Sequence, residues 1–372
     1  MRSLRCFLFV GFVALWPLCS FASNAYKAQD AIDRGAFVEA LNILLPLAES
    51  GDIESQIKIG GMYYNGQGTI ADKTQAFKWY LRAAEAGNAY AQGVIGTAFR
   101  NGEVVAVDKR QAVKWYSMAA EQGEPSIQRA LGLMYYAGEG VTLNKSTAAM
   151  WLHRAADQGD PAAEASLGLM YREGDGVQQS KVRAVELLTR AAEKQVVLAQ
   201  SALGFMYRDG EGVAVDKVTA LHWFEMAAAS AEPNAQTALG IMYRKGDGVL
   251  VDKSKAFVWL NKAAQNGNAY AQSVLGVMYS TGEGIQVDKQ KAVDWWLNAA
   301  AKGDVEAQAN LGNAYASGDG VTVDYLAAAK WYCTAAAQGN GAAQNYLTEL
   351  LQKEEITAED GAGQSECRYI SK

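Results

Sequence analysis

Glycine returns in this chain at a fixed interval of 36 residues, and this period constrains the fold more than any other feature. The glycines that mark it are Gly66, Gly102, Gly138, Gly174, Gly210, Gly246, Gly282 and Gly318. A second glycine follows two positions later in seven of the eight turns, and Val104 is the exception. An Ala-Ala pair keeps the same interval, from Ala83-Ala84 to Ala335-Ala336. Repetition at this spacing is typical of a repeat array, not of a set of compact domains.

Each repeat predicts two helices joined by the Gly-x-Gly turn. Apolar residues recur at helical spacing in the first helix, as Leu167 and Tyr171 do, and the turn glycines allow the backbone angles that end it. Proline suits its first turn, and stands there at Pro125, Pro161 and Pro233. A capping carboxylate or amide should open the second helix and a glycine should close it. The predicted caps are Asp72, Asp108, Asn144, Asp216, Asp252, Asp288 and Asp324, and the closing glycines are Gly87, Gly123, Gly159, Gly267, Gly303 and Gly339.

A further glycine stands inside each first helix, where it costs about 1 kcal/mol relative to alanine. These glycines are Gly60, Gly96, Gly132, Gly168, Gly204, Gly240, Gly276 and Gly312. Close approach of two helices would offset that loss. We expect two columns of rings to fill the space beside them, one from Tyr63 to Tyr315 and one of tryptophans from Trp79 to Trp331. Replacing a tryptophan of a middle repeat by alanine should then cost about 3–5 kcal/mol.

The pattern resembles the Sel1-like repeat family, a relative of the tetratricopeptide repeats. The resemblance rests on runs such as Ser-Leu-Gly-Leu-Met-Tyr-x-x-Gly-x-Gly-Val at residues 166–177, and on a second helix that in most repeats carries Lys-x-x-Ala, tryptophan and Ala-Ala. It implies an all-α, right-handed α/α superhelical solenoid of helix-turn-helix repeats with an inner concave surface.

The repeat phase divides the chain into four parts. Residues 53–340 form eight repeats of 36 residues. Residues 23–52 are predicted to be an N-terminal capping half-repeat, and 341–372 a C-terminal capping helix with a polar tail. Residues 1–22 are predicted to be a signal peptide.

Two junctions in the middle of the array depart from the pattern. The fourth repeat has Leu187 in place of the tryptophan and Gln195 in place of the closing glycine, and the fifth has Ala231 in place of that glycine. We therefore predict a local change of superhelical curvature over residues 187–235.

The N-terminus has the organisation of a secretory signal. Arg2 and Arg5 supply positive charge, Phe7–Leu18 an apolar core, and Ser20-Phe21-Ala22 a small-x-small cleavage site. The alternative is a membrane anchor, but the apolar run is shorter than the roughly 20 residues needed to span a bilayer. We predict cleavage after Ala22 and a periplasmic or secreted protein.

Charge and cysteine content bear on partners and compartment. Loss of Arg2 and Arg5 would take the net charge from −6 to −8, which disfavours binding to nucleic acid and to anionic lipid. Cleavage would leave Cys333 and Cys367, and an oxidising compartment favours a disulfide between them that pins the tail to the last repeat. The alternative is two unrelated free cysteines.

Residue types needed for catalysis or metal binding are scattered. His153 and His222 lie in different repeats with unlike neighbours, which does not fit a zinc site or a catalytic triad. The Gly-x-Gly turns lack the Lys-Ser or Lys-Thr of a phosphate loop. Each turn offers one carboxylate, whereas calcium requires several oxygens from one loop. We predict no catalytic, cofactor-binding or metal site.

The best candidate binding surface is formed by one residue of each repeat, the one directly after the aromatic residue of the Tyr63-to-Tyr315 column. The predicted partner-binding residues are Tyr64, Arg100, Tyr136, Arg172, Arg208 and Arg244, and stacking would align them as a stripe of residue types favoured at hot spots. Such a stripe would suit a carboxylate-rich partner segment. In the alternative interpretation, loop acids satisfy the arginines. The spacing suits local ion pairs, because Arg172, Arg208 and Arg244 precede Asp175, Glu211 and Asp247 by three residues.

The function that the resemblance implies is that of an adaptor. We expect a non-enzymatic protein-binding scaffold, monomeric when free, that holds a protein partner on its concave face and carries no membrane-inserted segment. Exported Sel1-like members include immunity proteins that neutralise a secreted antibacterial effector, such as a type VI phospholipase. Alternatives are a secreted virulence factor that binds host proteins and a penicillin-binding or β-lactamase-like Sel1 protein. The last type carries a cysteine pair in each repeat, whereas this chain would keep one pair in total after the predicted cleavage.

Overall fold

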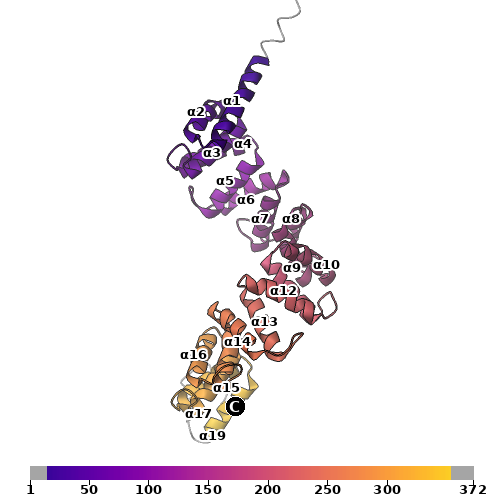
Figure 1. The fold of residues 1–372 in the computed structure, drawn as a ribbon, viewed down its shortest axis with the longest axis vertical. Coiled ribbons are helices and arrows are strands. Elements are labelled where there is room, and N and C mark those ends of the chain that lie inside the picture. The colour runs from indigo at the N-terminus through magenta and orange to yellow at the C-terminus, as the bar shows by residue number, and fades with distance from the viewer. Residues whose placement is uncertain (1–14, 353–372) are drawn as a thin grey trace, which may run out of the picture. The chain divides into compact units, whose positions relative to one another are not determined.

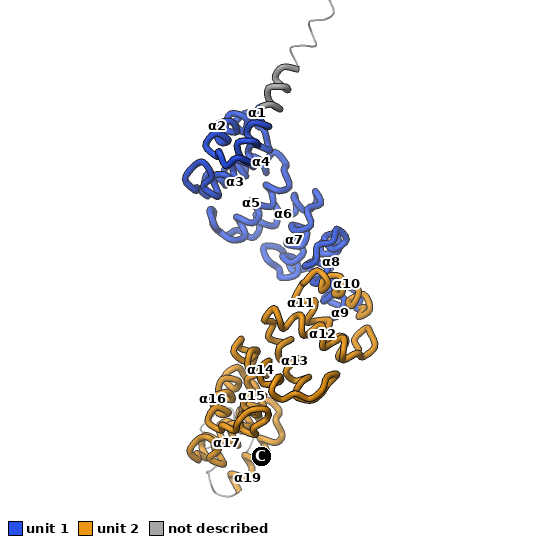
Figure 2. Tube along the Cα trace, in the orientation of Figure 1, with its two compact units in different colours: residues 1–179 blue, residues 180–372 orange. Residues whose placement is uncertain are grey.

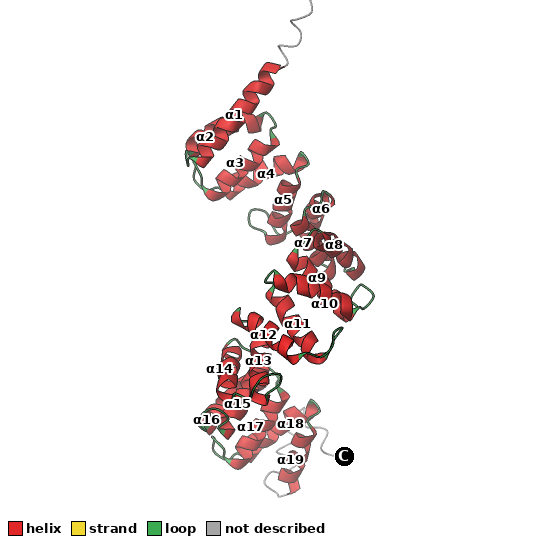
Figure 3. Cartoon of the chain, turned by 45° about the vertical axis from the view of Figure 1, so that its right-hand side comes forward, coloured by secondary structure: helices red, strands yellow, loops and turns green. Residues whose placement is uncertain are grey.

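Helices account for all the regular secondary structure in the part of the chain that is described. The computed structural model describes residues 15–352, with side chains from residue 24, and this range contains 19 helices and no strand (Figures 1 and 3). Neighbouring helices pack in tandem pairs, which confirms the predicted all-α solenoid. The chain divides into two compact units, residues 1–179 and 180–372, and each is described by itself (Figure 2).

Unit 1 contains four first helices and three second helices, preceded by two others. The preceding helices are α1 (Leu15–Asp33) and α2 (Phe37–Glu49). The first helices are α3 (Ile53–Asn65), α5 (Ala89–Asn101), α7 (Pro125–Ala137) and α9 (Pro161–Glu173). The second helices are α4 (Lys73–Glu85), α6 (Lys109–Glu121) and α8 (Lys145–Asp157). Each second helix packs against the first helix of its own repeat and against the next first helix.

Unit 2 repeats the same arrangement. Its first helices are α11 (Val197–Asp209), α13 (Pro233–Lys245), α15 (Ala269–Thr281) and α17 (Val305–Ser317). Its second helices are α10 (Lys181–Glu193), α12 (Lys217–Ala229), α14 (Lys253–Gln265), α16 (Lys289–Ala300) and α18 (Tyr325–Ala337). The helix α19 (Gly341–Gln352) follows α18 and packs on it.

The N-terminal predictions are tested only in part. Ala40 and Ala48 are buried in α2, where they take the places that the alanines of a second helix take in the repeats. The helix α1, which the repeat phase did not predict, runs through residue 22, and Ala28 and Ala31 bury against α2. Residues 1–14 lie outside the described residues, so the signal peptide and its cleavage stay predictions. No helix in the described range is long and apolar enough to cross a membrane.

The predicted helix boundaries are confirmed. All seven predicted caps accept hydrogen bonds from backbone N–H groups of the first turn, as Asp216 does from Val218 and Thr219 at 3.0 Å. The three prolines begin α7, α9 and α13. The eight glycines that end the first helices have φ between +69° and +77°. Only glycine adopts this conformation without steric penalty, which explains why it recurs there.

The glycines inside the first helices lie against side chains of the second helices, as predicted, but not against the predicted columns. A Cβ atom on Gly204 would lie 2.5 Å from the ring of Phe224, and one on Gly240 would lie 2.6 Å from Leu260. For seven of the eight glycines, the contacting residue is the one directly after the tryptophan position. The residues that occupy this place are Tyr80, Tyr116, Leu152, Phe224, Leu260, Trp296 and Tyr332.

Most tryptophans of the column border the core, and the side chains that contact the inner glycines are those of the following residue. Trp79 and Trp151 are buried, whereas the other five tryptophans of the column are only partly buried. Long basic side chains cover several of them: the Arg154 guanidinium lies 4.5 Å from the Trp151 ring centroid, and Lys262 Nζ lies 4.2 Å from that of Trp259. Successive residues of a helix point about 100° apart, so the residue after the tryptophan faces the glycine.

A column of buried glutamines, not noticed in the sequence, joins successive repeats. Glutamine is the fourth residue of seven first helices, and each of these side chains is nearly inaccessible. In each case Nε2 donates to the carbonyl of an alanine eight residues earlier, as Gln128 does to Ala120 at 3.0 Å. A buried amide that lacked such a partner would cost about 1–3 kcal/mol. At these seven junctions the glutamine therefore holds the end of the preceding helix against the next first helix, whereas α9 has Glu164 at this position.

The two irregular junctions keep the backbone of the regular ones. Gln195 has φ +65° and Ala231 has φ +61°, and in the described range they are the only residues other than glycine with positive φ. Leu187 is buried in place of the tryptophan. Helix termination is thus preserved, and the predicted change of curvature over residues 187–235 stays a prediction.

Candidate binding surface on the first helices

The six predicted partner-binding residues occupy one structural position. Each is the second-last residue of a first helix, directly before the turn: Tyr64 in α3, Arg100 in α5, Tyr136 in α7, Arg172 in α9, Arg208 in α11 and Arg244 in α13. Tyr64 and Tyr136 are 44% and 38% exposed. Each unit therefore presents its members of the stripe at one end of its first helices.

In unit 1, stripe residues contact the turn carboxylate of the next repeat, 39 residues on. Tyr136 Oη donates to Asp175 at 2.8 Å, and Arg100 lies 3.4 Å from Glu139. A lysine at the start of the intervening second helix shares each carboxylate. These lysine pairs are Lys73–Glu103 at 3.1 Å, Lys109–Glu139 at 3.5 Å and Lys145–Asp175 at 2.6 Å.

Unit 2 shows the same pairing between repeats. Arg244 Nε lies 2.7 Å from a Glu283 carboxylate oxygen. The local pair predicted between Arg244 and Asp247 is wrong, because Asp247 pairs instead with Lys217 of the preceding repeat. Arg208 also departs from the predicted spacing, since both its Nε and its Nη2 lie 2.7 Å from the carboxylate of Asp209.

The turns bring these partners together through their second glycine. In the turn of residues 174–176, a Cβ atom on Gly176 would lie 2.5 Å from the carbonyl carbon of Lys145, so the turn rests on the N-terminus of the preceding second helix. The carboxylate between the two glycines, Asp175, is thereby placed beside the Lys145 side chain. Contact across repeats therefore replaces the local contact that the spacing suggested.

These contacts change the acidity of two turn carboxylates. Hydrogen bonds from Lys145 and Tyr136 lower the pKa of Asp175 below its usual value of 3.8. The hydrogen bonds and the positive charge of Arg244 lower the pKa of Glu283 below 4.5, although partial burial opposes the shift. Both carboxylates are therefore charged at neutral pH and engaged within the protein. The binding role of the arginine and tyrosine stripe stays a prediction.

Three grooves open between successive first helices, and the same repeat positions line all of them. The ninth and twelfth residues of one repeat face the sixth and ninth of the next. These residues are Gly61, Tyr64, Val94 and Thr97 in unit 1, and in unit 2 Phe205, Arg208, Ala238 and Ile241, then Val277, Ser280, Asn310 and Asn313. The volumes are about 520, 430 and 330 Å³. We call the surface that carries these grooves the first-helix face.

The groove in unit 1, here called groove 1, is the largest of the three and the richest in aromatic side chains. Tyr64, Phe77, Tyr80 and Tyr90 line it. The Tyr80 and Tyr90 rings meet edge to face with centroids 6.2 Å apart, and burial raises the pKa of Tyr80. Gly61 makes room for the groove, since a Cβ atom there would meet only the Tyr80 hydroxyl, at 3.5 Å.

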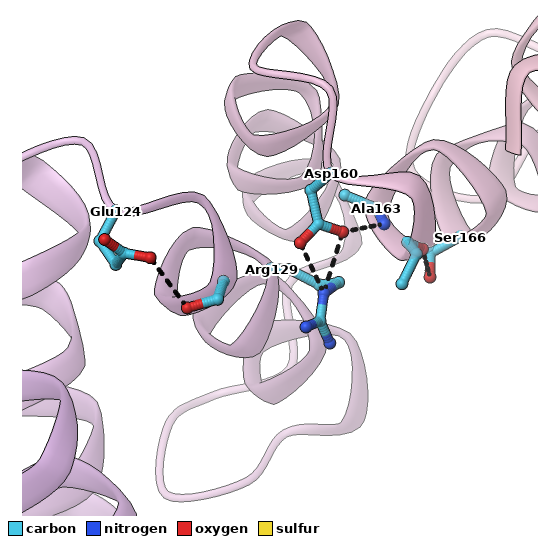
Figure 4. A network of polar contacts seen from close by, with 7 residues as sticks. Glu124, Arg129, Asp160, Ala163 and Ser166 are labelled. Carbon is cyan, nitrogen blue, oxygen red and sulfur yellow. Dashed lines mark hydrogen bonds and ion pairs between the residues drawn. The ribbon is translucent and has the colours of Figure 1, made fainter. Parts of the chain in front are cut away.

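An arginine that the sequence prediction left out also lies on the first helices. Arg129 Nε lies 3.1 and 3.2 Å from the two carboxylate oxygens of Asp160, which also caps α9 by accepting from Ala163 N at 2.7 Å (Figure 4). The pair fixes the start of α9 relative to α7. Arg129 therefore has a role within the protein.

The remaining residues considered in the sequence are the two histidines and the cysteines Cys333 and Cys367. His153 is exposed and lies 3.5 Å from Asp157, and His222 is exposed on α12. Within the described range, no three His, Cys, Asp or Glu side chains cluster as metal ligands would. Cys333 is buried in α18 and is disulfide-bonded. Cys367 lies outside the described residues, so its pairing with Cys333 stays a prediction.

A tandem array of paired helices with grooves along one face defines a class of α-helical repeat scaffold. The Sel1 repeat family model matches residues 53–88, 89–124, 125–160, 161–196, 197–231, 233–268, 269–304 and 305–340. The chain belongs to the Sel1 repeat family, whose repeats mediate protein–protein interaction, and it is a protein-binding scaffold of that family.

Two solved structures resemble the chain over most of its length. One is a protective antigen present in uropathogenic Escherichia coli strains and displaying an SLR fold, with 36% identity and a TM-score of 0.76 over 84% of this chain and 67% of that one. The other is a Sel1 repeat protein from Oxalobacter formigenes, with 35% identity and a TM-score of 0.64 over 82% of this chain and 89% of that one. No curated protein matches the chain.

Proposed function

We propose that this chain is a non-enzymatic scaffold that binds a protein partner on its first-helix face, in the periplasm or outside the cell. The observation that carries the proposal is the recurrence of grooves at equivalent repeat positions in both units. Binding sites are concave and largely apolar, with a few polar groups that fix orientation. Groove 1 has this character, because tyrosine and phenylalanine rings form its walls and charged side chains its rim.

Exposed tyrosines at the grooves support the same surface. Tyr90 borders groove 1 and is 58% exposed. Tyr270 is likewise the second residue of its repeat, borders a groove of unit 2 from one repeat further along, and is 51% exposed. Tyrosine buries a large area with little loss of side-chain entropy and is enriched at binding hot spots. The grooves and these rings together offer both pockets and anchors to a partner.

The test is affinity capture of the tagged protein from its own cell envelope and culture medium, followed by mass spectrometry. Two variants alter groove 1. Tyr90→Ala removes an anchor, and Gly61→Leu fills the groove with a side chain that Leu133 and Leu169 already place at the same repeat position. Tyr26→Ala removes an exposed tyrosine of α1 and serves as the control.

We expect both groove variants to lose the captured partner and the Tyr26→Ala variant to retain it. Capture that is equal in all three variants would overturn the first-helix face as the binding surface. Circular dichroism melting shows whether each variant is folded.

The identity of the captured protein separates the narrower roles. A toxic secreted effector whose activity is blocked by this chain would establish an immunity role, and several envelope proteins would indicate a general adaptor. A second candidate is a host-directed role, favoured by the protective antigen from uropathogenic Escherichia coli among the similar structures. That role predicts that the protein accumulates in the culture medium and captures a host protein.

A further inference from the structure

Groove 1 combines aromatic walls with an acidic rim. Lys73, Glu103 and Glu124 are its charged lining residues. Lys73 Nζ lies 3.1 Å from Glu103, so these two side chains neutralise each other, and it also lies 5.0 Å from the centroid of the Tyr64 ring. The aromatic wall is thus already in contact with one cation. The remaining rim charge is the carboxylate of Glu124.

The Glu124 side chain does not cap the helix that it precedes. It stands at the N-cap of α7 but accepts no backbone hydrogen bond there, whereas Glu232 at the same position caps α13 through Asn234 and Ala235. Its hydrogen bond is with the Ser126 hydroxyl, at 3.1 Å (Figure 4). Among residues 24–352, no basic side chain forms an ion pair with it. Glu124 therefore brings an uncompensated negative charge to the groove.

We infer that groove 1 receives an arginine side chain from the bound segment of the partner protein. This inference rests on the proposed function and specifies the chemistry of one of its grooves. A guanidinium stacks on aromatic faces and pairs with a carboxylate through two parallel hydrogen bonds. The tyrosine walls and Glu124 supply both kinds of contact.

Other side chains fit this groove less well. An aspartate or glutamate would meet the like charge of Glu124, and an aliphatic side chain would cover that carboxylate without pairing it. A lysine would pair with the carboxylate but would lack the planar group that stacks on Tyr64 and Tyr90. Arginine alone satisfies both the rings and the acid.

A random dodecapeptide library displayed on phage, panned against the purified protein, tests the inference. We expect selected peptides to share an arginine, and their synthetic versions to bind at least about ten-fold more weakly to Glu124→Gln. Gly61→Leu should abolish binding. Glu85→Gln, which removes the same charge from an exposed residue of α4 outside the groove, should bind like the unaltered protein. Replacing the shared arginine by lysine should weaken binding, and replacing it by glutamate should abolish it.

Selected peptides without arginine, or binding that Glu124→Gln leaves unchanged, would overturn the inference. Its failure is distinguishable from failure of the proposed function. If arginine-free peptides still lose binding to Gly61→Leu, the arginine site is wrong and the first-helix face stands. If capture of the natural partner survives both Gly61→Leu and Tyr90→Ala, the proposed surface itself is wrong.

Discussion

Single glycines determine how closely the two helices of a repeat approach. Substitution by alanine at two of these glycines should have opposite effects on stability. Gly204→Ala should destabilise the protein by about 1–3 kcal/mol, because the new methyl group would lie 2.5 Å from the buried Phe224 ring. Gly61→Ala should be neutral or stabilise by up to about 1 kcal/mol, since its methyl group has room and alanine favours the helix. Urea unfolding measures both. Equal effects would contradict the assigned packing.

Gln195 and Ala231, which have positive φ, are sites of stored strain. Gln195→Gly and Ala231→Gly should each stabilise by about 1 kcal/mol, because the left-handed conformation costs other residues roughly that amount. Gly123→Ala is the control in the opposite direction, from glycine to alanine. The φ of Gly123 is +98° and a Cβ atom there would meet nothing within 4 Å, so any loss of stability reports backbone strain alone. A fall in melting temperature for Gln195→Gly would refute the strain.

The sequence predicted which residues end and begin helices, because caps and turn glycines act on neighbouring backbone groups. It did not identify the side chain that packs on each inner glycine. Trp223 and Phe224 are both aromatic neighbours in the sequence, and only the helix geometry shows that Phe224 faces Gly204. The buried glutamines kept the same 36-residue interval, so that signal was present and could have been found.

At the level of helices, the second helix is anchored by the residue after the tryptophan. Phe224→Ala should cost about 3–5 kcal/mol, because Phe224 is fully buried and its loss leaves a cavity beside Gly204. Trp223→Ala should cost only about 1 kcal/mol, since that ring is partly exposed. Chemical denaturation compares the two. A larger loss for Trp223→Ala would restore the original assignment of the tryptophan column to the core.

The turns between helices should make stability depend on acid. The folded-state pKa values of Asp175 and Glu283 lie below their ordinary values of 3.8 and 4.5, so folding favours their charged forms. Their stabilising effect is therefore present above about pH 4.5 and is lost as the pH falls through the folded-state pKa values. Melting curves from pH 7 to pH 3 should show a smaller acid loss in the double variant Asp175→Asn, Glu283→Gln. An identical loss would show that these carboxylates do not contribute.

Only part of the candidate binding surface could be predicted from the sequence. The sequence placed Tyr64 and Arg208 on one stripe, and both line grooves of the first-helix face. The grooves themselves arise where small residues such as Gly61 and Ala238 meet rings of a neighbouring helix, and such contacts have no local sequence pattern. The pairing of Arg244 with Glu283, 39 residues on, depends on the stacking of repeats and was equally hidden.

For the molecule as a whole, repetition explains how an extended binding surface is built. Each repeat contacts only its neighbours, so the array can vary the residues of its first helices while the caps, glycines and glutamines preserve the stack. Variation at the ninth position, from Gly61 to Phe205, changes groove size without changing the fold. We therefore expect specificity for a partner to lie on the first-helix face.

Hydrogen–deuterium exchange of the protein with and without its captured partner tests that claim most directly. We predict that the partner slows exchange around groove 1, in the first helices α3, α5 and α7 and in α4, whose Phe77 and Tyr80 line the groove, and that it leaves α6 unchanged. Slower exchange confined to the second helices would contradict the account, because it would place the binding surface on the opposite side of the repeats.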